Sequence, residues 1–162
     1  MRLNKIYSIV LIIGIFIAFT GFEFYRKSEK KVIGIINPAQ IEVDLNGNNV
    51  LDDGEIICVP NLKVFTSDLS QSQTELEKAL KLTHSEAIKL GYLTDIFAEN
   101  NLSGKSVKLQ YIGKTTPSCK YAEIVVDNEL YSKKLKNSGL GFDDKGNFTQ
   151  SYQSQLSLSL IH

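Results

Sequence analysis

Cysteine and histidine are scarce in this chain of 162 residues, which contains two of each. A structural zinc site needs more ligands than the two cysteines supply, so they do not predict one. The cysteines, Cys58 and Cys119, form no C-x-x-C motif, which argues against a redox-active pair. His84 is expected on the surface at the start of a helix and His162 is the last residue, so neither indicates catalysis.

An excess of positive charge is also absent. The whole chain is neutral, with 18 basic and 18 acidic side chains, and residues 32–162 hold 12 basic against 16 acidic. A protein that follows a nucleic-acid backbone is normally basic. Nucleic acid is therefore not an expected partner.

Long hydrophobic runs are missing except at the N-terminus, where residues 6–22 carry no charge. As a helix this run would be ~26 Å long, close to the ~30 Å hydrocarbon core of a bilayer. We expect an uncleaved transmembrane signal-anchor there, with a flank at 1–5 and a linker at 23–31. The alternative is a cleaved signal peptide, although no A-x-A cleavage pattern follows the run. Basic residues lie on both sides of it, so charge does not decide on which side of the membrane the body lies.

The rest of the chain alternates short apolar runs with turn residues and contains amphipathic segments, a pattern typical of an α+β fold. Strands are expected at 31–37, 40–45, 55–60, 62–65, 106–112 and 121–126, and helices at 74–82, 85–100 and 129–137, with Gly139 as the last helix's cap. Residues 143–162 show no clear pattern. They are either a truncated or artefactual end, or a β-like tail with Leu156, Leu158 and Leu160 on one face.

The sharpest local pattern is a twelve-residue loop from Asp44 to Glu55. Its oxygen-bearing residues follow the EF-hand spacing, which supplies the six to eight oxygens that Ca²⁺ needs. Asn49 stands where the pattern has glycine, and asparagine is the non-glycine residue best suited to a left-handed backbone there. The alternative is an acidic hairpin turn without a metal. The predicted ligands are the side chains of Asp44, Asn46, Asn48, Asp52 and Glu55 and the backbone carbonyl of Val50.

The body resembles the staphylococcal nuclease-like, or thermonuclease, family over residues 32–142. The segments that carry the likeness are VIGIINPAQIEVDLNGN, EIICVPNLKVFT, SEAIKLGYLTDIFAENNLSGKSVKLQYIG and CKYAEIVVDNELYSKKLKNSGLGF. The resemblance implies a five-stranded OB-type barrel with helices packed on it. It also implies calcium-dependent phosphodiester cleavage by two acidic metal ligands, a glutamate and two arginines.

None of those five catalytic side chains is retained at the matching positions. The resemblance places the acidic ligands on Ala39 and about Lys63, the glutamate on about Thr66, and the arginines on Cys58 and Cys119, or Lys120 if the match shifts by one. Losing one hydrogen-bond donor that stabilises the charge of the transition state lowers the rate by ~10²–10³-fold. No catalytic residue is therefore predicted.

The same resemblance makes Cys58 and Cys119 face each other across a small cleft, which implies a disulfide in an oxidising compartment. The alternative is two buried free thiols. A disulfide and a weak calcium site both work best outside the cytoplasm, which favours an extracytoplasmic body.

Three functions remain open from the sequence. The first is a membrane-anchored, catalytically inactive binding or scaffolding module for an unknown protein or envelope ligand. The second is a calcium-dependent nuclease with a rearranged active site. The third is a purely structural envelope protein.

Overall fold

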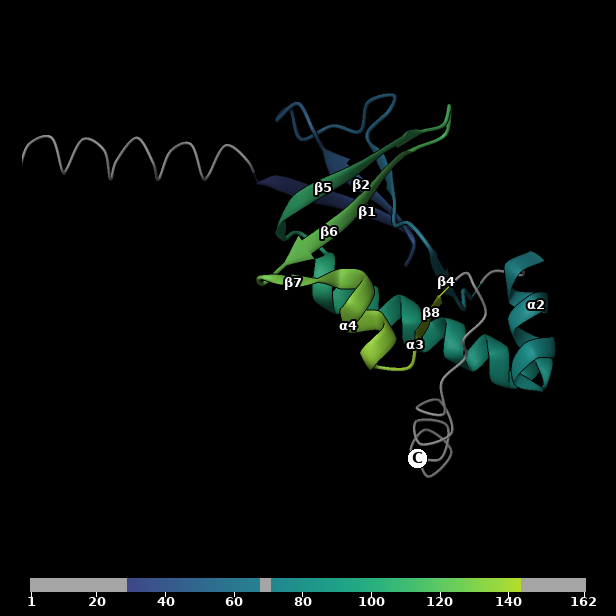
Figure 1. Cartoon of the computed structure of the whole chain (residues 1–162). Coiled ribbons are helices and arrows are strands. Elements are labelled where there is room, and N and C mark those ends of the chain that lie inside the picture. Colours follow the sequence, from purple (N-terminus) through teal and green to yellow (C-terminus); the bar gives the residue numbers. More distant parts are fainter. Residues whose placement is uncertain (1–28, 68–70, 144–162) are drawn as a thin grey trace, which may run out of the picture.

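The computed structural model describes residues 29–67 and 71–143, with the backbone alone for 71–73. Within these ranges the fold is α+β, as expected, with eight strands and three helices (Figure 1). In chain order they are β1 (Lys30–Asn37), β2 (Gln40–Asp44), β3 (Ile56–Cys58), β4 (Leu62–Val64), α2 (Gln71–Leu80), α3 (His84–Leu102), β5 (Ser106–Thr115), β6 (Lys120–Val126), β7 (Glu129–Leu130), α4 (Tyr131–Asn137) and β8 (Gly141–Asp143).

The expected anchor at 6–22 and nearly all of the expected tail at 143–162 lie outside the described residues. Among the helices in the described ranges, none combines the length and the apolar character needed to cross a bilayer.

Six strands form one sheet in the order β3-β2-β1-β5-β6-β7, and β3 also pairs with β6, so the sheet is partly closed. The β3–β6 pairing is parallel and places Cys58 opposite Tyr121. The other ladders of this sheet are antiparallel, and β1 meets β2 with Lys31 opposite Asp44. Strands β4 and β8 form a separate antiparallel pair.

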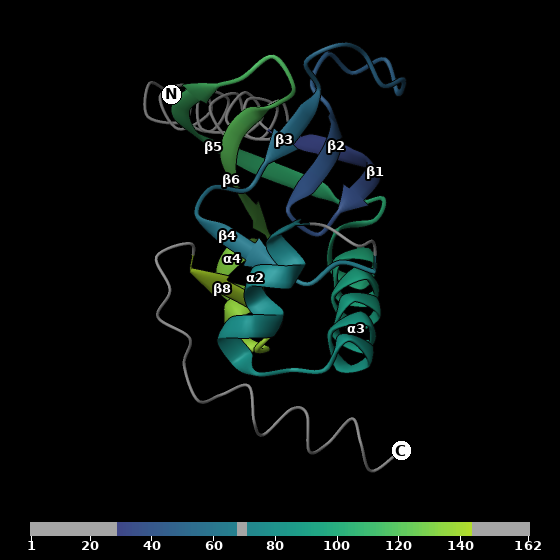
Figure 2. The same cartoon turned by 90° about the vertical axis from the view of Figure 1, so that its right-hand side faces the viewer.

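The core lies inside the curved sheet and continues between the sheet and the helices. Figure 2 shows α2, α3 and α4 together on one side of the sheet, with β4 and β8 among them. Phe65 and Phe142 meet edge to face with ring centroids 5.9 Å apart, which joins the end of β4 to β8. Fully buried side chains line this core: Val32, Ile41, Val43, Ile57, Phe65, Leu76, Leu102, Val107, Ile124, Tyr131 and Leu135.

Several predicted boundaries are corrected by the structure. Helix α3 begins at His84, and its N-cap is Thr83, which forms a capping box with Glu86. The predicted helix at 129–137 begins only at Tyr131, because residues 129 and 130 pair with β6 as β7. Strand β8 was not predicted, because its three residues are held by a distant partner, β4, and not by a local pattern. Gly139 does end α4 with a positive φ of 73°, as expected.

Candidate functional site

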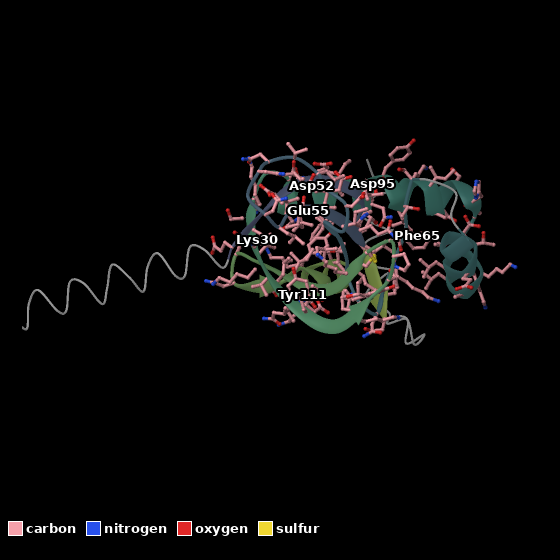
Figure 3. The ribbon with its side chains drawn as sticks, turned by 90° about the horizontal axis from the view of Figure 1, so that it is seen from above. Lys30, Asp52, Glu55, Phe65, Asp95 and Tyr111 are labelled. Atoms are coloured by element: carbon pink, nitrogen blue, oxygen red, sulfur yellow. A yellow bond between two sulfur atoms is a disulfide. The ribbon has the colours of Figure 1, made fainter. Side chains whose placement is uncertain are left out.

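The loop between β2 and β3 is built on two buried carboxylates, Asp44 and Glu55, each only 4% exposed. Oε1 of Glu55 accepts hydrogen bonds from the N–H groups of Leu45 at 2.8 Å and Asn46 at 3.2 Å. Its Oε2 accepts from the N–H of Asp52 at 3.0 Å, so one side chain ties both ends of the loop together. Figure 3 labels Asp52 and Glu55 beside each other in this loop.

Asp44 holds the first turn of the loop. Its Oδ1 accepts from the N–H groups of Gly47 at 2.6 Å and Asn48 at 3.1 Å, and its Oδ2 accepts from Asn49 at 2.9 Å. Burial raises the pKa of Asp44, but these three donors and the nearby Lys30 ammonium outweigh it and hold the pKa below the usual value. The carboxylate is therefore kept ionised.

Three of the predicted ligands converge at the exposed part of the loop. The side-chain amides of Asn46 and Asn48 both donate to Oδ2 of Asp52 at 2.7 Å. Asn49 adopts a φ of 60°, the left-handed conformation expected at the position where the pattern has glycine. Val50 is 59% exposed.

The six predicted ligands thus belong to one folded loop, but they are not gathered as a cluster of acids. Across residues 29–67 and 71–143, no group of three or more His, Cys, Asp or Glu side chains stands ready to hold a metal. The donor chemistry is nevertheless compatible with a hard cation, since each asparagine amide carries a carbonyl oxygen besides the nitrogen that donates to Asp52.

The second candidate region contains the disulfide. Cys58, the last residue of β3, is bonded to Cys119, just before β6, with Sγ atoms 2.12 Å and Cα atoms 5.9 Å apart. Both cysteines are buried. Thr116 stabilises the turn that carries Cys119. Its Oγ1 accepts from the N–H of Cys119 at 3.2 Å, and its N–H donates to the Cys119 carbonyl at 2.9 Å. The expected pairing is confirmed.

The disulfide borders a cleft of about 320 Å³ between β3, the segment that follows it, and the β5–β6 hairpin. Ala39 and Cys58, two of the five altered catalytic positions, line this cleft, and Cys119 is bonded to its wall. Lys114 is the single cation among the described lining residues, and none of them is a carboxylate. The lining residues are Ala39, Gln40, Cys58, Val59, Pro60, Asn61, Leu62, Ile112, Lys114 and Tyr121.

The other two altered positions lie elsewhere. Lys63 pairs with Glu75 of α2 at 2.9 Å. Thr66 lines a smaller hollow of about 170 Å³ together with residues of β1 and α3, including Asp95. The structure therefore brings three of the five positions together and separates two.

Sequence reasoning missed the contribution of the β5–β6 hairpin to the cleft. The Lys114 ammonium lies 4.6 Å from the centroid of the Tyr121 ring, a cation–π contact at the cleft wall. Ile112 is 50% exposed beside them. The available signal was a lysine near the end of one predicted strand and an aromatic near the start of the next, which shows proximity only once the strand register is known.

No protein-family model matches this chain, and no curated protein sequence matches it. The resemblance to thermonucleases accordingly stays a prediction that depends on the segments quoted above.

Proposed function

We propose that the chain is a membrane-anchored, extracytoplasmic binding or scaffolding module that has no nuclease activity. The observation that carries this proposal is the Cys58–Cys119 disulfide beside the cleft. The thermonuclease resemblance would put two arginines at these positions. A disulfide offers no positive charge to a phosphate, and phosphodiester cleavage needs cationic donors for its developing charge.

The strand order supports assignment of the barrel to the OB type. Strands β1, β2, β3, β6 and β5 follow one another around the sheet, with β3 and β6 parallel and the other neighbours antiparallel. An OB-fold is a five-stranded, partly open Greek-key barrel that takes ligands on its strand face and loops. The cleft beside the β5–β6 hairpin is a suitable place for such a ligand.

The compartment follows from the chemistry of the disulfide and the loop. Disulfides persist in oxidising compartments such as the bacterial periplasm or the cell exterior. The proposed anchor at 6–22 would hold the body at the membrane on that side. Millimolar calcium outside the cell would fill even a loop site with a dissociation constant of ~10⁻⁴–10⁻³ M.

Calcium in this proposal has a structural role. Asp44, Asn46, Asn48, Asp52 and Glu55 would hold the ion by side-chain oxygens and Val50 by its carbonyl. The ion would neutralise carboxylate charge in the loop and stiffen the connection between β2 and β3.

An activity assay on the purified full chain tests the proposal. DNA and RNA should remain intact in the presence of calcium, as they do with a chelator. Calcium-dependent digestion that follows the protein through purification would instead establish a nuclease with a rearranged site.

A second measurement separates binding from a purely structural role. Cross-linking in the native envelope should recover a partner with the wild-type chain and lose it with Tyr121→Ala and Lys114→Ala, which alter the cleft wall. Recovery that is identical for both variants would place the interaction elsewhere, and no specific partner at all would favour a purely structural protein.

A further inference from the structure

Two large apolar side chains lie exposed at the tip of the loop between β2 and β3. Val50 is 59% and Leu51 is 41% exposed, although the adjoining loop residues are polar. The loop that carries them is held in shape at its base, because Glu55 binds the N–H groups of Leu45 and Asp52. The tip therefore presents a fixed apolar projection.

This tip lies at the end of the sheet where the chain arrives from its N-terminal segment. Strand β1 begins at Lys30, and the side-chain ammonium of Lys30 donates to the Leu45 carbonyl at 2.7 Å. The Lys31 ammonium donates to Oδ1 of Asn49, the residue before Val50, at 3.2 Å. Figure 3 shows Lys30 near Asp52 and Glu55 of the same loop.

The chain outside the described residues limits how far this end can stand from a bilayer. Only seven residues, 23–29, separate the uncharged run that ends at Phe22 from Lys30. Fully extended, they reach ~25 Å. If the run spans a membrane, the loop tip lies within reach of its surface.

Charge at this end favours an anionic lipid surface. Residues 23–31 hold four cations, Arg26, Lys27, Lys30 and Lys31, against the two acids Glu23 and Glu29, a net charge of +2. Basic residues just outside a transmembrane segment are drawn to anionic headgroups. Their attraction counteracts the repulsion from Asp52 and Asp53, which follow the apolar tip.

We propose that Val50 and Leu51 insert into the surface of the anionic membrane that anchors the chain, and that this contact fixes the orientation of the barrel. The inference rests on the proposed N-terminal anchor. It adds a second, peripheral membrane contact, made by the folded domain itself. The β5–β6 hairpin and its cleft then face away from the bilayer, open to a partner.

A tryptophan reporter tests this contact in the full chain, which contains no tryptophan of its own. The variant Val50→Trp is reconstituted into phosphatidylcholine–phosphatidylglycerol vesicles that contain brominated acyl chains. The control is Ile112→Trp, similarly exposed at 50%. Ile112 lies six residues along β5 from Ser106, the partner of Lys31, or roughly 20 Å from this end.

The expected result is strong bromolipid quenching and a blue-shifted emission at position 50, with neither at position 112. Leu51→Trp provides a second reporter should Val50→Trp fold poorly, as judged by its disulfide and circular dichroism. Vesicle flotation identifies which proposal fails. A chain that floats but is quenched equally at positions 50 and 112 overturns the docking alone, whereas a chain that does not float overturns the anchor and the docking together.

Discussion

The main-chain N–H of Asn49 donates to Oδ2 of Asp44 at 2.9 Å, while Asn49 itself holds a φ of 60°. Asn49 therefore contributes its N–H to the buried carboxylate at the point where the backbone of the loop turns left-handed. Both residues belong to the predicted calcium-type loop, and each can be altered separately.

Asn49→Gly should stabilise the fold by about 0.5–1 kcal/mol, since glycine adopts positive φ without the steric cost of a side chain. Chemical denaturation in urea measures the change. Asn49→Val should destabilise it by about 1–2 kcal/mol, because a β-branched side chain is poorly tolerated there. A loss of stability in the glycine variant would show that the Lys31 contact to the Asn49 side chain outweighs the backbone term.

Asp44 should make stability depend on acidic pH. Its pKa in the folded chain lies below the ordinary aspartate value of 3.8, so its stabilising effect is complete above that value and is lost as pH falls further, through the lowered pKa. Wild type should exceed Asp44→Asn in unfolding free energy near neutral pH, and the difference should shrink below pH 3.8. Asp53→Asn, at an exposed neighbour, is the control. A difference that persists unchanged at the lowest pH would contradict the prediction.

Calcium should stabilise the fold if the loop binds it. With a dissociation constant of ~10⁻⁴–10⁻³ M, about 5 mM calcium should add about 1–2 kcal/mol to the unfolding free energy. Glu55→Gln should abolish most of this increment, whereas Glu99→Gln on the exposed side of α3 should leave it intact. Thermal denaturation with calcium, magnesium or chelator provides the measurement, and equal curves in all three would argue for a metal-free turn.

Reducing the disulfide should lower stability by about 4 kcal/mol, because the bond closes a loop of 61 residues in the unfolded chain. Urea denaturation with and without dithiothreitol measures this loss. The double variant with Cys58→Ala and Cys119→Ala should have the same unfolding free energy as the reduced wild type, and dithiothreitol should not change it. If the reductant left the wild-type midpoint in place, the bond would contribute nothing to stability.

Gly91→Ala should destabilise the protein although alanine is the better helix former by ~1 kcal/mol. A Cβ at Gly91 would lie 2.3 Å from the carbonyl oxygen of Thr66. Helix α3 would have to move from the backbone that follows β4, at a cost of about 1–3 kcal/mol. Ser85→Ala, exposed on the same helix, should change stability by less than ~0.5 kcal/mol. A stabilised Gly91→Ala variant would contradict the close approach.

The local patterns in the sequence were sufficient for the α+β class and most element positions. Short apolar runs bounded by turn residues located β1, β2, β5 and β6, and the Asp44–Glu55 spacing located the loop with a left-handed residue at Asn49. These features depend on neighbours within a few residues, so a linear pattern records them.

Features that depend on distant parts of the chain were missed or misplaced. A glycine inside a helix indicates only a local weakness from sequence, yet Gly91 is the residue that lets the backbone of Thr66 approach α3. The resemblance matched Lys63 and Thr66 to catalytic positions of the same family site as Cys58, but β4 turns toward α2 and β8 and carries them away from the cleft.

By itself, the sequence determined the element types, the candidate calcium ligands and the acidic balance of the body, since these follow from local spacing and composition. The Cys58–Cys119 pairing was expected from a family resemblance, and the parallel contact of β3 with β6 is what brings the two cysteines together. Only the tertiary structure placed Tyr121 and Lys114 on the wall of the same cleft and the Lys31 ammonium on the side chain of Asn49. These neighbours are far apart in the chain, and the closure of the sheet, which no local pattern encodes, decides which of them meet.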